Sequence, residues 1–371
     1  MSLDNYPGSW CEIHLDRISR NLALTLGLVP PGRRFCAVLK ADAYGHGIAQ
    51  VVPLVQAQGV TCIGITSNAE ARAVRAAGFD GTLIRLRAAT ADEIDNALDM
   101  RIEEQVSSVA VAEKLNALKA AGHTVRTHLA LNALGMSRDG LEISTDKGWS
   151  ICRSILNFLG TDIVGICTHF PCNKPENLRA SAALFHDQVS RIIENSALKR
   201  SDILIHAGSS LTLISDEAVE TDMYRCGAIL YGILKPELGF QTTMDLKARV
   251  VSVGDYPKGA SVGYDRACRL NSDRRLACLS IGYANGFRRD RDSGAAVLLG
   301  DQLAPVLGKI SMNTLVVDAT DIDGVQAGDE ARVFGGIADA KTSLGATERQ
   351  FRTIMADLYA DWGMRNERIF C

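Results

Sequence analysis

Short apolar runs alternate with segments of helical periodicity through the first two thirds of the chain. Runs rich in β-branched and aliphatic residues predict strands at 35–39, 61–65, 83–86, 102–107, 127–132, 163–168, 203–206 and 228–231. Helical patterns fill most of the intervals, for example at 70–77, 109–121 and 180–193. Strands that alternate with helices in this number predict an α/β fold, with a closed (β/α)8 barrel of the TIM type over residues 1–236.

The pattern changes after about residue 235. Short strand-like runs at 249–253, 276–281, 304–309, 314–318 and 331–334 are divided by Gly, Asp and Pro. This spacing predicts a mostly-β C-terminal domain over residues 237–371. An early run at 10–15 predicts one more strand, which could belong to either part.

The composition excludes several classes of function. The chain has 371 residues and a formal net charge of −3 at pH 7, so its charge favours neither nucleic acid nor an anionic membrane. No apolar run approaches the ~18 residues that cross a bilayer. The ten cysteines include no CxxC pair, so we expect no metal site and a reducing, cytoplasmic compartment. A periplasmic location stays open if a signal peptide was removed.

A lysine closes the first predicted barrel strand. Lys40 follows the apolar run at 35–39 and precedes a loop of Gly, Tyr and His. A lysine at the end of a buried strand is costly unless its charge is used or its pKa falls. It either extends its ammonium to solvent or supplies the reactive amine that forms a Schiff base with pyridoxal phosphate. Because (β/α)8 barrels place their chemistry at the C-terminal ends of strands, the second reading agrees with the predicted fold.

The string at 37–47 closely resembles the cofactor-lysine signature of the alanine racemases, which are fold-type III enzymes that use pyridoxal 5′-phosphate (PLP). The resemblance continues in order along nearly the whole chain, through 206–210, 223–232, 261–266, 281–286 and 308–313. It implies that Lys40 carries the cofactor. The other residues that it implies around PLP are Tyr44, Arg138, His169, Ser209, Ser210, Arg225, Gly227 and Ala228.

The resemblance implies a distinct role for several of these residues. Arg225 would face the pyridine nitrogen and, because arginine keeps its proton, would leave that nitrogen unprotonated. Ser210, Gly227 and Ala228 would bind the phosphate. Taken without the resemblance, a Gly-Ser-Ser run before a helix is equally typical of an ordinary N-cap.

Racemisation removes a proton from one face of the α-carbon and returns one to the other, so two bases on opposite faces can perform it. Lys40 would be one base and Tyr264 the other. In the family this tyrosine enters from the partner subunit, which implies a homodimer with shared active sites. Free amino acids would be the substrates, and their expected contacts are Arg138, Tyr283, Met312 and Asn313.

Several departures resemble the broad-specificity amino-acid racemases within this family. Ala130 replaces a lysine that is carbamylated in many alanine racemases, and Asn132 replaces an aspartate. In the broad-specificity group a chloride ion is expected where the carbamate would sit. Ala356 matches a position at which alanine racemases carry a bulky tyrosine, which predicts a wider pocket. Asp139 departs even from the broad-specificity pattern, and would either face a cationic substrate or pair with a nearby arginine.

Three alternatives remain beside a broad-specificity racemase. The first is a strict alanine racemase that supplies D-alanine for peptidoglycan. The second is a non-catalytic PLP-binding protein, against which the predicted β domain and Tyr264 argue, because such proteins resemble the barrel alone. The third is a PLP-dependent decarboxylase, in which an acid rather than Arg225 would face the cofactor nitrogen.

Overall fold

The computed structural model describes residues 6–289, 294–335 and 342–371, and these form two compact units. The barrel unit comprises Asn21–Ala43 and Ile48–Leu230. The β unit comprises the N-terminal segment as far as Arg20, the short stretch Tyr44–Gly47, and Tyr231–Cys371. Among the helices that the described residues form, none is both long and apolar enough to cross a membrane.

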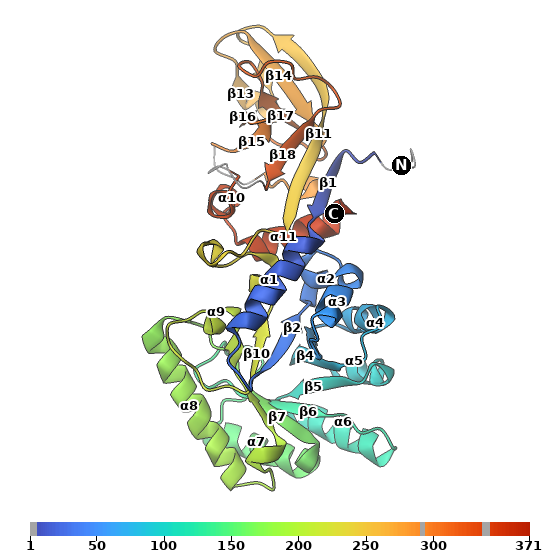
Figure 1. The fold of residues 1–371 in the computed structure, drawn as a ribbon, viewed down its shortest axis with the longest axis vertical. Coiled ribbons are helices and arrows are strands. Elements are labelled where there is room, and N and C mark those ends of the chain that lie inside the picture. Colours follow the sequence, from blue (N-terminus) through green and yellow to red (C-terminus); the bar gives the residue numbers. More distant parts are fainter. Residues whose placement is uncertain (1–5, 290–293, 336–341) are drawn as a thin grey trace. The chain divides into compact units, whose positions relative to one another are not determined.

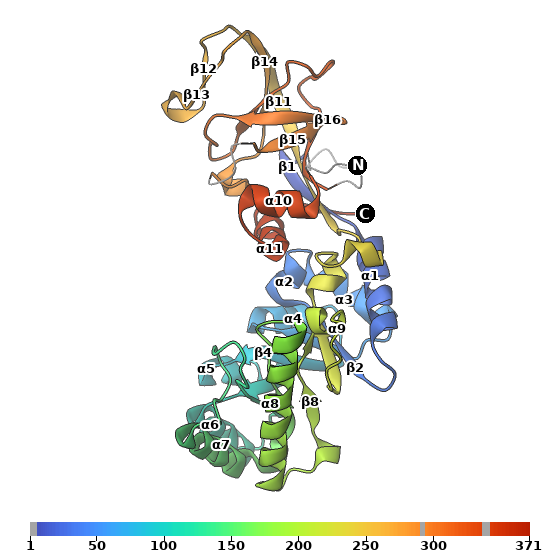
Figure 2. The same cartoon turned by 90° about the vertical axis from the view of Figure 1, so that its left-hand side faces the viewer.

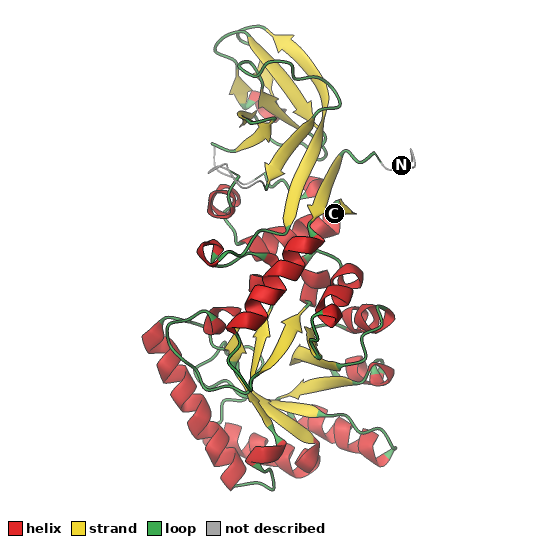
Figure 3. Ribbon diagram, viewed as in Figure 1, coloured by secondary structure: helices red, strands yellow, loops and turns green. Residues whose placement is uncertain are grey.

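The barrel unit is built on a parallel sheet that closes on itself. Its strands follow the order β8-β7-β6-β5-β4-β3-β2-β10-β9. At one end of this order β8 pairs with β7, and at the other end β9 pairs with β10. Only Ala207 separates β8 from β9 in the chain, so the two ends of the sheet meet and the barrel is closed. The TIM-type barrel is therefore confirmed, with strands inside and helices outside (Figure 3). The strands are β2 (Arg34–Val38), β3 (Cys62–Ile65), β4 (Thr82–Ala88), β5 (Ile102–Val106), β6 (Thr127–Ala130), β7 (Ile163–Cys167), β8 (Leu204–His206), β9 (Gly208–Ser209) and β10 (Met223–Cys226).

The prediction of the last barrel strand, at 228–231, was wrong. Residues 228–231 form a 3-10 helix, η4 (Ala228–Tyr231), and the strand is β10, immediately before it. Arg225 interrupts the apolar character of β10, so its sequence does not look like a buried strand. In the structure Arg225 is only 8% exposed, and its charge is satisfied by hydrogen bonds across the barrel.

The helices of the barrel unit cover the outside of the sheet (Figure 1). The expected helices are present at α4, α6 and α8, the last of which begins earlier than predicted. Ser67 and Glu70 form a capping box at the start of α4, which explains where that helix begins. The helices are α3 (Ile48–Ala57), α4 (Asn68–Ala76), α5 (Ala91–Asp95), α6 (Val109–Ala120), α7 (Asp146–Leu159), α8 (Pro175–Glu194) and α9 (Ser210–Leu213); α1 (Leu15–Leu28) begins in the β unit and continues into the barrel unit.

The β unit contains an eight-stranded sheet in the order β14-β17-β16-β15-β18-β11-β1-β19. Because β14 also pairs with β11, the strands from β14 to β11 form a closed ring. The early strand β1 pairs with both β11 and β19, so it belongs to this unit. The strands are β1 (Ser9–Ile13), β11 (Met244–Tyr256), β14 (Arg274–Leu279), β15 (Ala296–Leu299), β16 (Gln302–Leu307), β17 (Leu315–Asp318), β18 (Glu330–Phe334) and β19 (Glu367–Phe370).

Every strand expected after residue 235 has a counterpart in this sheet. The sequence pattern did not predict the helices α10 (Leu344–Phe351) and α11 (Met355–Arg365). A small hairpin of β12 (Ser261–Val262) and β13 (Cys268–Arg269) also extends from the unit, beyond the main sheet (Figure 2).

Candidate active site

Lys40 begins an unusual backbone turn at the C-terminal end of β2. Ala41, Asp42 and Ala43 all have φ between 52° and 57°, and Tyr44 has φ of 55°. The left-handed conformation costs about 1–2 kcal/mol for each residue with a Cβ. A run of such residues persists only where the surroundings hold it. Two carboxylates do so here: Glu70 accepts a hydrogen bond from the Ala41 N–H (2.7 Å), and Asp42 accepts one from the Ile48 N–H (2.8 Å).

Desolvation and neighbouring charges set the pKa of the Lys40 amine. Part of the lysine side chain is exposed, yet desolvation of its ammonium lowers its pKa. Repulsion from Arg138 lowers the pKa further, and the Glu70 carboxylate opposes both effects. A lowered pKa leaves a larger fraction of the lysine neutral, which is the form that acts as a nucleophile or a base.

His169, which follows β7, lies within reach of the same charges. Desolvation lowers its pKa to about 4, with further repulsion from Arg225, Arg138 and Lys40. The imidazole is therefore neutral at physiological pH. The structure thus places Lys40, Arg138, His169 and Arg225, expected from the sequence, around one end of the barrel.

Arg225 lies inside the barrel and is held by three hydrogen bonds. Its Nη1 donates to the Nδ1 (2.6 Å) and the carbonyl oxygen (2.8 Å) of His206, and its Nη2 donates to the carbonyl oxygen of Thr168 (2.8 Å). A guanidinium carries five N–H groups, so these bonds leave one Nη2 hydrogen and the Nε hydrogen for other acceptors.

A buried chain of hydrogen bonds continues from Arg225 through the barrel. His206 Nε2 lies 2.9 Å from His128 Nδ1, and His128 Nε2 lies 2.8 Å from Glu103 Oε2. Burial alone would raise the pKa of Glu103, but His128, Arg126 and Arg34 outweigh it and hold that pKa below its usual value. The ionised carboxylate can only accept, so each histidine donates toward Glu103 from Nε2. His206 Nδ1 is left as the acceptor for Arg225.

Glu103 and His128 were not among the residues expected from the sequence. Both lie at buried positions of short strands that carry several polar residues, so no apolar pattern singles them out. Only the pairing of β5 with β6 and of β7 with β8 shows that these side chains meet.

Two loops that were expected to bind phosphate lie side by side. The Ser210 hydroxyl accepts a hydrogen bond from the Gly227 N–H (3.1 Å), which joins the start of α9 to the start of η4. Ser209 is the N-cap of α9 and accepts from the Thr212 N–H (3.3 Å). The N-cap interpretation of Ser209 is thus what the structure shows. Ala228 begins η4 directly after Gly227.

The loop after β6 fixes Arg138 through polar bonds. Asn132 accepts from the Ser137 N–H (2.8 Å) and donates to Glu142 (2.7 Å), which holds the loop in a tight turn. Arg138 Nε lies 3.3 Å from Asp139 Oδ1, and the other Asp139 oxygen accepts from the N–H of Ala88 (3.3 Å). Of the two roles considered for Asp139, the structure shows the pairing with arginine.

The expected second base lies on the hairpin of the β unit. Tyr264 begins the short helix η6 (Tyr264–Arg266) and is 64% exposed. Gly263 precedes it with φ of 75°, and a Cβ at Gly263 would lie 2.6 Å from the backbone nitrogen of Lys309. The tyrosine is thus presented to solvent by a turn that packs closely on the loop before Lys309.

The expected substrate contacts of the β unit come from two adjoining segments. The Tyr283 N–H donates a hydrogen bond to the Ser311 carbonyl oxygen (3.1 Å). The Ala284 N–H donates one to the Met312 carbonyl oxygen (2.9 Å). Tyr283, Met312 and Asn313 are all exposed.

Tyr44 and Ala356 also lie in the β unit. The ring of Tyr44 lies 4.8 Å from that of Tyr231, centroid to centroid. Ala356 lies in the first turn of α11 and is half-buried, so a larger side chain at this position would project from the start of the helix.

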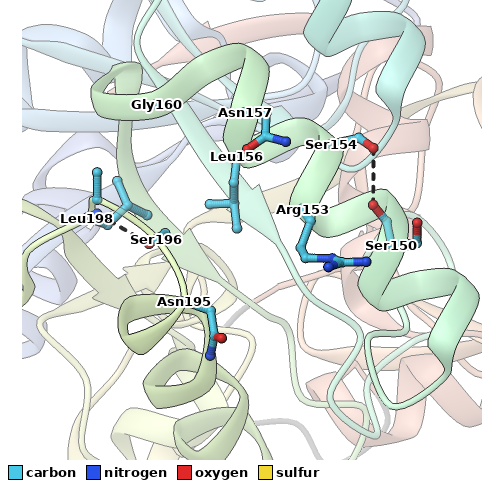
Figure 4. Close-up of a pocket in the computed structure, with 10 residues that line it drawn as sticks. Ser150, Arg153, Ser154, Leu156, Asn157, Gly160, Asn195, Ser196 and Leu198 are labelled. Atoms are coloured by element: carbon cyan, nitrogen blue, oxygen red, sulfur yellow. Dashed lines mark hydrogen bonds between the residues drawn. The ribbon is translucent and has the colours of Figure 1, made fainter.

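A cavity lies away from these residues. It has a volume of about 600 Å³ and is lined by α7 and the segment after α8, including Arg153 and Asn195 (Figure 4). Its lining residues Gly160 and Leu198 precede β7 and β8 in the chain, so the cavity lies toward the end of the barrel opposite Lys40. It therefore does not belong to the candidate active site.

One group of three potential metal ligands occurs within the described part of the chain, at Glu12, His14 and Asp245. Glu12 pairs with Lys247 (2.8 Å), and Asp245 lies 3.6 Å from His14 and 4.0 Å from Arg17. The two carboxylates of this group thus have the cationic neighbours Lys247 and Arg17.

The chain matches both domains of one protein family. Residues 13–235 match the alanine racemase N-terminal domain, and residues 243–370 match the C-terminal domain. It is 39% identical over 363 residues to a broad specificity amino-acid racemase of Pseudomonas putida, covering 97% of this chain and 89% of the relative. It is 34% identical over 362 residues to a lysine racemase of Proteus mirabilis, with the same coverage of both chains.

Solved structures support the same assignment. Alanine racemase from the D-cycloserine producer Streptomyces lavendulae superposes with a TM-score of 0.87 at 25% identity, covering 99% of this chain and 98% of that one. Alanine racemase from Bartonella henselae with covalently bound pyridoxal phosphate gives a TM-score of 0.84 at 22% identity, covering 99% and 100%. The resemblance seen in the sequence is confirmed, and the chain belongs to the alanine racemase family.

Proposed function

We propose that this protein racemises free amino acids with PLP, acts on several substrates, and uses Lys40 and Tyr264 as its two bases. The observation that carries the proposal is the position of Lys40. It lies on a left-handed turn at the C-terminal end of a barrel strand, with a lowered pKa and with Arg138 and His169 beside it.

The residues at this end of the barrel fit PLP. The N-termini of α9 and η4 adjoin through Ser210 and Gly227, so their N–H groups suit a phosphate. Arg225 keeps donor hydrogens beyond its bonds to His206 and Thr168, which suit an unprotonated ring nitrogen. Lys40 would hold the cofactor covalently, and Tyr44, Arg138 and His169 would complete its surroundings.

When bound, PLP supplies the electron-withdrawing group that acidifies the substrate's α-hydrogen. Lys40 Nζ would move this proton on one face of the α-carbon, and Tyr264 Oη would move it on the other. Arg225 would orient the ring nitrogen without giving it a proton, because the guanidinium does not deprotonate. This arrangement favours proton transfer over decarboxylation.

Broad specificity is proposed on three sequence features that the structure locates. Ala356 occupies the first turn of α11 without a bulky side chain, and Asn132 replaces an aspartate in the loop of Arg138. The third feature is the segment 85–90, which resembles that of the broad-specificity racemases; its Arg87 lies near the end of β4 and donates a hydrogen bond to Glu93 of α5 (3.0 Å). The alternative is a strict alanine racemase, and a relative named alanine racemase in Desulfovibrio desulfuricans is 31% identical over 338 residues, covering 88% of this chain and 89% of the relative.

We also propose a homodimer in which Tyr264 serves the partner's site. The exposure of Tyr264 on a projecting hairpin supports this assembly. A cytoplasmic location is proposed as well, and the ten cysteines, all unpaired in the structure, suit a reducing compartment.

A chloride ion is proposed beside Ala130, where the carbamate of ordinary alanine racemases would sit. The loop that carries Arg138 returns to β6 at this point, because the Leu141 N–H donates to the Ala130 carbonyl oxygen (2.8 Å). Asp139 already pairs with Arg138, so the anion would be bound weakly. Titration with chloride at fixed ionic strength, followed by thermal unfolding, tests this site.

The deciding experiment is a chiral assay of the purified protein with PLP against each L-amino acid. We expect racemisation of alanine or serine and of at least one long substrate such as lysine, arginine or methionine. Lys40→Ala should abolish turnover together with the visible absorbance of the bound cofactor. Tyr264→Phe should keep that absorbance and lower turnover by roughly 10²–10⁴-fold. Turnover of alanine alone would replace the broad-specificity proposal with a strict alanine racemase.

A further inference from the structure

We infer that Glu70, at the start of α4, is a positioning residue for Lys40, because its carboxylate fixes the peptide that joins Lys40 to the left-handed turn. The inference rests on the proposed role of Lys40. It assigns to Glu70 a function beyond the capping of its own helix.

The Glu70 carboxylate accepts hydrogen bonds from backbone N–H groups of two separate segments. Oε2 accepts from the N–H groups of Thr66 (2.6 Å) and Ser67 (3.1 Å), which belong to the start of its own helix. Oε1 accepts from the N–H of Ala41 (2.7 Å), which lies 29 residues earlier in the chain. A capping box uses only the local bonds, so the bond to Ala41 is additional.

The bond to Ala41 acts on the conformation of Lys40. The Ala41 N–H belongs to the peptide plane that begins at the Lys40 carbonyl carbon, so fixing its direction fixes ψ of Lys40. The same bond holds the first of the left-handed residues, none of which is glycine. Release of this N–H would let the turn relax and would loosen the backbone from which the Lys40 side chain extends.

Glu70 also places a negative charge near the Lys40 amine. Charged and titratable groups of three elements act on this amine: Arg138 from the loop after β6, the neutral His169 after β7, and Glu70 from α4 are among its neighbours. Glu70 raises the pKa of Lys40, against the lowering by desolvation and by Arg138. Its two effects, on direction and on charge, can be separated by substitution.

Three variants of the full-length protein test the inference. Glu70→Gln removes the charge and keeps one acceptor oxygen, which can serve either Ala41 or the Thr66 and Ser67 N–H groups, but not both. Glu70→Ala removes the charge and both oxygens. Ser67→Ala is the control, because it removes only the side-chain cap of the same helix and leaves the Glu70–Ala41 bond in place. If Glu70→Ala does not fold, Glu70→Asp, whose carboxylate is one methylene shorter, takes its place.

Two readouts do not require turnover. Hydrogen exchange at the Ala41 amide, measured by NMR, should rise at least tenfold in Glu70→Ala, rise by less in Glu70→Gln, and stay near wild type in Ser67→Ala. The pKa of Lys40, measured by competitive labelling of the cofactor-free protein, should fall in both Glu70 variants and stay unchanged in Ser67→Ala. In the PLP-loaded enzyme, Glu70→Ala should lose more turnover than Glu70→Gln.

The inference is overturned if Ser67→Ala changes both readouts as much as Glu70→Ala, since Glu70 would then act only through helix α4. It is also overturned if Ala41 exchange and the pKa of Lys40 remain at wild-type values in Glu70→Ala. A protein that shows the expected exchange and pKa changes but racemises no amino acid would refute the proposed function and leave the positioning role intact.

Discussion

Individual side chains around Lys40 illustrate how burial and neighbouring charge set protonation. His169 is kept neutral mainly by desolvation and then by three cations, and its pKa is about 4. His206 is neutral for a related reason, because complete burial and Arg225 lower its pKa. Arg225 can therefore remain the one cationic member of its buried hydrogen-bonded chain.

The lowered pKa of His169 predicts a pH dependence of stability. An unfolded histidine titrates near pH ~6.5 and the folded His169 near 4, so between these values the unfolded state binds more protons. The free energy of unfolding should consequently fall as the pH drops from about 6.5 toward 4. His206 contributes in the same direction, so His169→Gln should reduce this slope without abolishing it. Urea unfolding across this range measures the effect, and an unchanged slope in His169→Gln would contradict it.

Ala356 provides a test of substrate range at a single position. Ala356→Tyr introduces a bulky phenol at the start of α11, where the natural side chain is half-buried. We expect kcat/KM for lysine, arginine or methionine to fall by more than tenfold relative to kcat/KM for alanine, because only long side chains need the vacated volume. Steady-state chiral assays measure this ratio. Equal losses for short and long substrates would show that Ala356 does not set the range.

Among the structural elements, the β12–β13 hairpin depends on close backbone packing. Gly263 combines φ of 75° with a would-be Cβ contact of 2.6 Å to the Lys309 nitrogen. Gly259, in the turn before β12, has φ of 87° but nothing within 4 Å of its would-be Cβ. Both glycines therefore have positive φ, but Gly263, with ψ of 176°, lies in a region that essentially only glycine adopts, and Gly263 is also crowded.

Gly263→Ala and Gly259→Ala form a matched pair. Gly259→Ala should lose about 1–2 kcal/mol of stability from its positive φ, and Gly263→Ala should lose more, because its backbone conformation is essentially restricted to glycine. Only Gly263→Ala should also shift Tyr264, because its new methyl group must push against Lys309. We expect a loss of racemase turnover of at least tenfold in Gly263→Ala and little change in Gly259→Ala. If both variants lose the same turnover, crowding at Gly263 does not position the tyrosine.

The complete assembly can be tested through complementation. If Tyr264 acts in the partner's site, mixing Lys40→Ala with Tyr264→Phe protein yields dimers that contain one intact site. Some turnover should then return, up to about a quarter of the wild-type value when subunits exchange at random, because half of the dimers are mixed and each has one of two sites. Native mass spectrometry shows whether exchange has occurred. No recovery despite exchange would place both residues in the site of one chain.

The sequence was sufficient for the order of the barrel and β elements and for the family. Periodicity marks buried strands, and the motif at Lys40 combines several residue types that rarely occur together by chance. It was also sufficient to name Lys40, Arg138, His169, Ser210 and Arg225, which the structure places at the C-terminal ends of barrel strands or in the loops that follow, with Arg225 in the last strand. The sequence did not locate β10, because Arg225 interrupts the apolar pattern expected of a buried strand.

Tertiary structure alone showed how polar groups are partnered. Glu103, His128 and His206 come from different strands and form one chain only because parallel pairing brings them together inside the barrel. Asp139 could have faced a substrate, and the fold pairs it with Arg138 and the Ala88 N–H. Glu70 caps its own helix, and the fold gives it the Ala41 N–H as well. Hydrophobic periodicity reports which face of an element is buried, whereas the partner of a polar group depends on residues distant in sequence.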